Sequence, residues 1–74
     1  MTKLPQVSGK DLVMALQKIN YKIIRQKGSH IRLYPTDKFK KKITVPDHKI
    51  IGKDLLRKIL RDAEISVDKL IGLL

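Results

Sequence analysis

The chain has 74 residues, enough for one small domain and close to the lower size at which a single apolar core holds a fold without staples. It contains no cysteine, which excludes disulfides, cysteine metal sites and a cysteine nucleophile, and which favours a reducing compartment. Seventeen Lys and Arg against seven Asp and Glu give a net charge of +10. Such a domain is expected to bind a polyanion, which leaves RNA, DNA, an anionic membrane or an acidic protein open. The alternative is a solvated basic surface without a specific ligand.

The sequence carries no sign of a targeting or membrane segment. No apolar stretch follows Lys3, as a signal peptide would require, and no run approaches the ~20 apolar residues of a membrane span. No internal repeat, low-complexity tract or linker interrupts the chain. We therefore expect a single domain over residues 1–74 in the cytoplasm, with no membrane contact.

The first element is predicted to be a helix that begins at about Gly9 and ends at Asn20. Ser8 is a good N-cap, Asp11 stands where a capping-box acid would be, and Val7 and Leu12 occupy the positions of a hydrophobic staple. Asn20 tolerates the left-handed conformation that stops helices. The apolar positions then recur at helical spacing, which predicts one buried face: Leu12, Val13, Ala15, Leu16 and Ile19.

Two strand-like runs follow, over residues 21–26 and 30–34, and Gly28 and Ser29 supply the turn between them. Alternation in the second run puts Ile31 and Leu33 on one face of the sheet and His30, Arg32 and Tyr34 on the other. The first run alternates less cleanly, so its faces stay unassigned. If the apolar pair faces the helices, His30 lies on the open face beside a cation and an aromatic ring.

The rest of the chain predicts one more strand and two helices. Residues 35–37 break the second strand, a lysine-rich run over residues 38–42 leads into a third strand at 43–45, and Pro46 closes it. A second helix starts near Gly52 or Asp54, and a last one follows the N-cap Ser66. The expected architecture is a two-layer α+β domain with the helices on one face of a three-stranded antiparallel sheet. The other face stays open for a ligand.

His30 is the candidate catalytic residue, because histidine can take and give protons near neutral pH and this one stands among cations. A histidine at a strand start also serves commonly as a surface or packing residue. Lysines 40, 41 and 42 fit a phosphate clamp, but lysines also protect edge strands from aggregation. Tyr34 could stack on a base or pack under a loop. His48 could supply a second proton or order its loop.

Five blocks of the sequence stand in a characteristic order, at residues 8–10, 25–30, 45–48, 56–63 and 65–66. Together with Tyr21 they resemble the HicA-type toxins, mRNA interferases of the YcfA-like family with a double-stranded-RNA-binding-domain-like fold. Tyr21 matches the aromatic residue of the usual Gly-Phe pair, where Asn20 replaces the glycine. Residues 53–55 depart from the usual Gly-Thr entry to the second helix.

The resemblance implies an endoribonuclease that acts on mRNA without a metal or other cofactor, and that a HicB-type antitoxin inhibits by covering the His30 face. The family's catalytic histidine maps onto His30, and its second histidine maps onto His48. The phosphate contacts that we assign beside them belong to Arg25, Lys27, Gly28, Ser29, Arg32, Lys40, Lys41 and Lys42.

Other chemistries fit less well. Ser29 adjoins His30 on a strand, where successive side chains point to opposite faces, so a serine triad is not supported. No carboxylate pairs with a histidine at a metal-ligand spacing, and the acidic residues are scattered: Asp11, Asp37, Asp47, Asp54, Asp62, Glu64 and Asp68. Two further hypotheses stay open, a non-catalytic module that grips structured RNA and a basic surface that docks an acidic protein.

Overall fold

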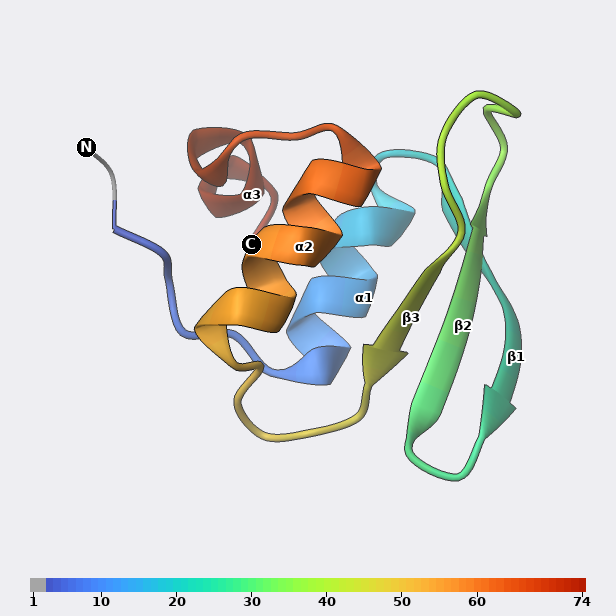
Figure 1. Cartoon of the computed structure of the whole chain (residues 1–74), viewed down its shortest axis with the longest axis horizontal. Helices are drawn as coiled ribbons and strands as arrows, with labels where there is room; N and C mark the ends of the chain where they lie inside the picture. Colours follow the sequence, from blue (N-terminus) through green and yellow to red (C-terminus); the bar gives the residue numbers. More distant parts are fainter. Residues whose placement is uncertain (1–2) are drawn as a thin grey trace.

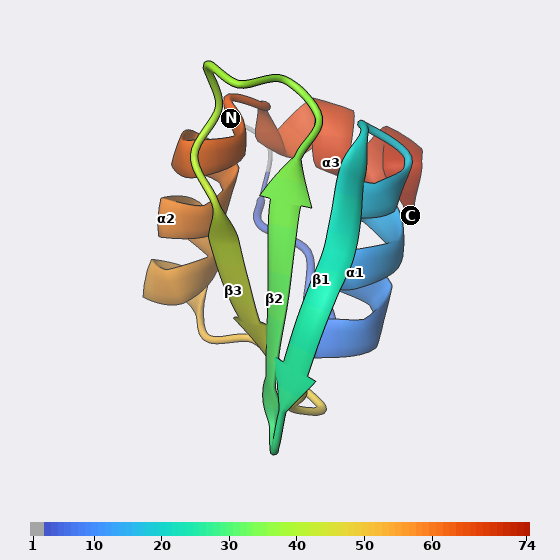
Figure 2. The same ribbon diagram turned by 90° about the vertical axis from the view of Figure 1, so that its right-hand side faces the viewer.

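Three helices lie on one side of a three-stranded sheet, two of them against it, and leave the other face bare (Figures 1 and 2). The computed structural model describes residues 3–74. The sheet is antiparallel throughout, and its strands lie in chain order. The elements are α1 (Gly9–Gln17), β1 (Tyr21–Lys27), β2 (His30–Pro35), β3 (Ile43–Pro46), α2 (Lys53–Ala63) and α3 (Val67–Leu73). The α+β architecture predicted from the sequence is confirmed.

The helix starts follow the capping residues. Ser8 Oγ accepts a hydrogen bond from the Asp11 amide at 3.0 Å, and Ser66 Oγ accepts one from the Lys69 amide at 3.0 Å. Each bond satisfies one of the amide groups that a helix N-terminus leaves without a partner. The N-cap of α2 is Gly52, which offers no side-chain hydrogen bond, and Asp54 lies in the first turn.

Two residues with positive φ redirect the chain after helices. Asn20 has φ 74° after α1 and turns the chain into β1, as its tolerance of this conformation predicted. Glu64 has φ 59° at the end of α2, and the Ile65 amide beyond it donates to the Leu60 carbonyl at 3.0 Å. A glutamate in the left-handed region is strained, because its Cβ crowds the backbone.

The irregular alternation of β1 has a structural cause. Ile23 pairs with Leu33 and Arg25 pairs with Arg32, so the register shifts between them and leaves Ile24 as an extra residue. Such a bulge reverses the side-chain alternation of the strand. Ile23 and Ile24 are both exposed, and the register shift could not be read from residues 21–26 alone.

The core lies between the sheet and the helices. Ile31 and Leu33 of β2 are buried together with Ile43 and Val45 of β3, as the alternation predicted for β2. Their partners from the helices, the start of β1 and the adjoining segments are Val7, Leu12, Val13, Ala15, Leu16, Tyr21, Ile51, Leu56, Ile59, Leu60, Ala63 and Leu70. Sixteen buried hydrophobic residues form one cluster, so the helices hold a single sheet face and the opposite face is free to meet a ligand.

Candidate functional site

Cross-strand pairs gather the predicted site on the open face of the sheet. Lys27 stands opposite His30, Arg25 stands opposite Arg32, and Arg32 also pairs with Thr44 of β3. Residues directly opposite each other in antiparallel strands point to the same face. All five side chains are exposed, whereas Ile31 and Leu33 between them are buried on the helix side.

These residues line a hollow of about 640 Å³ at the turn end of the β1–β2 hairpin. The sequence predicted every lining residue except Thr44. The missed signal was the alternation of β3, in which Ile43 and Val45 face the core and Thr44 must face the other way. The lining residues are Arg25, Lys27, Gly28, Ser29, His30, Arg32 and Thr44.

The turn beside His30 is tightly held. Gly28 has φ 59° and is the first of the two turn residues, which fits a type II′ hairpin turn and explains the glycine. The Asp47 amide donates to the Ser29 carbonyl at 2.6 Å, and Gln26 Nε2 donates to the Gly28 carbonyl at 3.3 Å. The start of β2, where His30 lies, is therefore anchored from outside the hairpin as well as from within it.

The start of α1 contacts the same part of the molecule, the corner where His30 at the start of β2 meets residues 46–48 after β3. The Gly9 amide donates to the His48 carbonyl at 2.8 Å, and a Cβ at Gly9 would collide with the carbonyl oxygen of Pro46. Pro46 pairs with His30 in the sheet. Three blocks that are distant in the sequence, residues 8–10, 25–30 and 45–48, thus meet at one place, and Gly9 permits the close approach.

The hollow is basic and lacks counter-charge. The ion pairs found within residues 3–74 join Lys41 and Lys58 to Asp62, and Arg57 to Asp54, and none involves the cations that line the hollow. No acidic residue occurs between Asp11 and Asp37 in the sequence. Like charges directly opposite each other on a sheet, as in the Arg25 and Arg32 pair, destabilise the fold. A bound anion would offset this repulsion.

A family model described as HicA toxin of bacterial toxin-antitoxin matches residues 9–65 of this chain. This chain belongs to the HicA toxin family. The match spans α1, the whole sheet and α2, so it includes every residue that lines the hollow. Searches of the curated proteins and of the solved structures find no match. Membership of the HicA family implies an antitoxin partner of HicB type.

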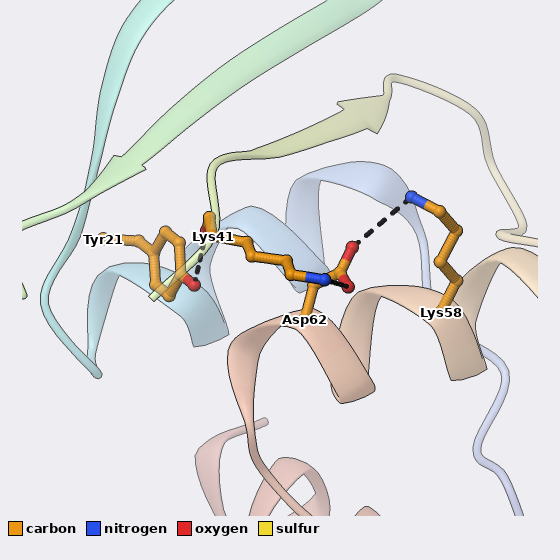
Figure 3. A network of polar contacts seen from close by, with 4 residues as sticks. All are labelled: Tyr21, Lys41, Lys58 and Asp62. Atoms are coloured by element: carbon orange, nitrogen blue, oxygen red, sulfur yellow. Dashed lines mark hydrogen bonds and ion pairs between the residues drawn. The ribbon is translucent and has the colours of Figure 1, made fainter. Parts of the chain in front are cut away.

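The lysine run of this HicA-family chain does not reach the hollow. Lys41 Nζ lies 4.0 Å from Asp62, and the Lys41 carbonyl accepts a hydrogen bond from the Tyr21 hydroxyl at 2.9 Å (Figure 3). Lys42 Nζ lies 4.6 Å from the centroid of the Tyr34 ring, a cation–π contact. Neither lysine is among the lining residues, nor is Lys40. Residues 40–42 thus lie beyond the other end of β2, and Tyr34 is covered by a lysine.

His48 is also outside the hollow. It is exposed in the loop after β3, and its backbone carries its visible interactions, accepting from Gly9 and donating to the Pro46 carbonyl at 2.9 Å. The residues 3–74 contain no group of three or more His, Asp or Glu side chains that could hold a metal ion. Among the helices of this same part of the chain, none is long and apolar enough to cross a membrane.

Tyr21 links β1 to the loop between β2 and β3 in this HicA-family fold. Its side chain is 1% exposed, and its hydroxyl donates to the Lys41 carbonyl. Burial raises the pKa of Tyr21 above its ordinary value of 10.0, and the negative charges of Asp62, Glu64 and Asp37 raise it further. The hydroxyl is thus held in its neutral, donating form, and it fixes the loop that follows β2.

Proposed function

We propose that this HicA-family protein is an endoribonuclease that cleaves mRNA, with His30 as its proton-transfer residue and no metal in the reaction. The hollow on the open face supports this function best, because an exposed imidazole stands there beside three cations that have no acidic partner in residues 3–74. A phosphodiester supplies the negative charge that those cations lack.

In the proposed reaction the 2′-oxygen of a ribose attacks the adjacent phosphorus. The O2′–P bond forms, the P–O5′ bond breaks, and the products are a 2′,3′-cyclic phosphate and a 5′-hydroxyl. His30 takes the 2′-hydroxyl proton as general base, or protonates O5′ if the RNA binds in the opposite sense. Arg25, Lys27 and Arg32 contact the phosphoryl oxygens and stabilise their growing charge.

The proposed mechanism uses one imidazole for proton transfer, and this limits the rate of RNA cleavage. His48 does not line the hollow, so we assign it to the loop, and solvent supplies the proton for the departing oxygen. A single general acid or base contributes roughly 10² to 10⁴ to the rate. We expect a slow nuclease, which suffices to deplete mRNA in a growing cell and which works in the cytoplasm, where mRNA is translated.

The antitoxin is proposed to cover the same face. A HicB-type partner that lays acidic residues over Arg25, Lys27 and Arg32 would neutralise the hollow and keep RNA away from His30. The positive face therefore serves both the substrate and the inhibitor.

Expression of the intact chain and of His30→Ala in bacterial cultures tests this function. The intact chain is expected to arrest growth and shorten cellular transcripts, and the variant is expected to do neither while still folding and binding RNA. His48→Ala is the matched control, because it removes the other imidazole outside the hollow, and it should retain toxicity. If the intact chain and His30→Ala behave alike and mRNA stays whole, the protein is a binding module.

A further inference from the structure

The loop between β2 and β3, residues 36–42, displays an aromatic ring that the chemistry at His30 does not use. Phe39 is 83% exposed. Lys38 Nζ lies 5.4 Å from the centroid of its ring, and Lys40, Lys41 and Lys42 follow directly in the sequence. An apolar ring surrounded by cations is poorly matched to water alone but well matched to a nucleobase on a charged backbone.

The loop that carries Phe39 is held in shape. The Phe39 amide donates to Asp37 Oδ1 at 2.9 Å, and the Lys40 amide donates to the Asp37 carbonyl at 3.1 Å. The contacts of Lys41 with Tyr21 and Asp62 tie the far side of the loop to β1 and α2 (Figure 3). The backbone that carries the ring is therefore largely held in place before any ligand arrives, which lowers the entropy cost of binding.

The ring borders a second, smaller hollow of about 250 Å³. Its lining includes Lys41 and Arg61 as well as Phe39, and two acids, Asp62 and Glu64. Asp62 is already paired with Lys41 and Lys58, so its negative charge is compensated. The surroundings of Phe39 thus keep a basic balance, since Lys38 lies over the ring, Arg61 lines the hollow and Lys40 is the next residue in the chain.

Strand β2 connects this loop with His30. His30 begins β2 and the loop follows Pro35, so five steps of about 3.3 Å separate the two ends of the strand, roughly 17 Å in all. Arg32 and Tyr34 lie along this path, Lys22 is paired with Tyr34, and the three strands contain no acidic residue. Figure 2 shows the hairpin turn at one end of the sheet and the loop at the other.

We propose that Phe39 is a stacking platform for a base of single-stranded RNA, some nucleotides away from the bond held over His30. This inference rests on the proposed function, which places the cleaved bond at His30 and so sets the direction in which the RNA runs toward Phe39. Stacking accepts any base because every base has a π-face, so Phe39 selects single-stranded substrates of sufficient length and not a sequence. The flanking cations favour RNA over an apolar protein anchor, since each phosphate they neutralise releases counterions.

The test measures affinity in the His30→Ala background, where the RNA stays intact. Labelled single-stranded oligonucleotides of about 4 and about 12 nucleotides, within the footprints seen for single-strand-binding folds, are titrated against four added substitutions. Phe39→Ala removes the ring, Phe39→Leu keeps apolar bulk without a π-face, and Phe39→Trp keeps stacking. Met14→Ala is the matched control, because Met14 is an exposed apolar residue of α1 on the helix side.

Phe39→Ala and Phe39→Leu are each expected to weaken binding of the longer RNA about 5-fold or more, by the loss of one stacked base. They should leave the shorter RNA unchanged, and Phe39→Trp and Met14→Ala should bind both as the parent does. Unchanged affinity in Phe39→Ala, full affinity in Phe39→Leu, or an effect on antitoxin binding alone would overturn the proposal. If the His30-containing chain fails to cleave while the length-dependent loss persists, the nuclease function fails and the stacking site stands.

Discussion

Replacing Gly9 with alanine tests the contact that joins the start of α1 to the His30 corner. A Cβ at this position would meet the Pro46 carbonyl oxygen and approach the Asp47 Cα at 3.0 Å, and these are backbone atoms that cannot rotate away. Overpacking of this kind costs about 1–3 kcal/mol. Alanine in a helix regains roughly 0.5–1 kcal/mol relative to glycine. The free energy of unfolding should therefore fall by about 1–2 kcal/mol.

Urea unfolding followed by circular dichroism measures this loss, and Gly72→Ala is the matched control. Gly72 lies in α3 with no atom within 4 Å of an added Cβ, so alanine there should stabilise the fold by roughly 0.5–1 kcal/mol. The two Gly→Ala changes are thus expected to have opposite signs. Pro46 pairs with His30, so Gly9→Ala should also lower the rate of RNA cleavage, by roughly 10²-fold for a shift near 1 Å. A Gly9→Ala protein as stable and as active as the parent would refute this account of the corner.

Three further predictions concern the loop, α2 and the hollow. The pKa of Tyr21 is raised in the folded state, so the folded state favours the neutral phenol. This contribution to the free energy of unfolding is complete below pH 10.0 and is lost as the pH rises from there through the folded-state pKa. Tyr21→Phe removes the hydrogen bond to Lys41, so its free energy of unfolding near pH 7 should be about 0.5–1.5 kcal/mol lower than that of the parent. Above pH 10.0 the free energy of unfolding of Tyr21→Phe, measured in urea, should fall less steeply with pH than that of the parent, and equal slopes would contradict this. Glu64→Gly should raise the free energy of unfolding by roughly 1 kcal/mol by relieving the left-handed residue, and no gain would mean that the strain is absent. Arg32→Gln should weaken RNA binding and flatten its salt dependence by about one phosphate contact, and an unchanged salt slope would place the phosphate elsewhere.

Much of the fold was predictable because it depends on local chemistry. Ser8 and Ser66 cap their helices through hydrogen bonds to amides three residues further along the chain. Helix α1 ends at Gln17, three residues earlier than predicted, and Asn20 turns the chain toward β1 through its own backbone conformation. The alternation of β2 placed Ile31 in the core and His30 on the open face, and this required only the pleat of a strand. The residues that line the hollow follow from the same two strands, so most of them could be predicted as well.

The features that could not be predicted depend on contacts between distant segments. The bulge at Ile24 is defined by the partner strand, and the need for glycine at position 9 arises from Pro46, far along the chain. Lys41 and Lys42 were grouped with the phosphate contacts, but the fold directs them to Asp62 and to the Tyr34 ring. Consecutive lysines in the sequence thus contact different partners in the folded protein, and the sequence alone does not show which.

The most direct measurement of the central claim is cleavage of a purified RNA by the purified protein in the presence of a metal chelator, with product ends identified by mass. We predict products with 2′,3′-cyclic phosphate and 5′-hydroxyl ends, and a cleavage rate for His30→Ala that is roughly 10² to 10⁴-fold lower at unchanged RNA affinity. Cleavage that the chelator abolishes, products with 5′-phosphate ends, or an undiminished rate in His30→Ala would contradict it.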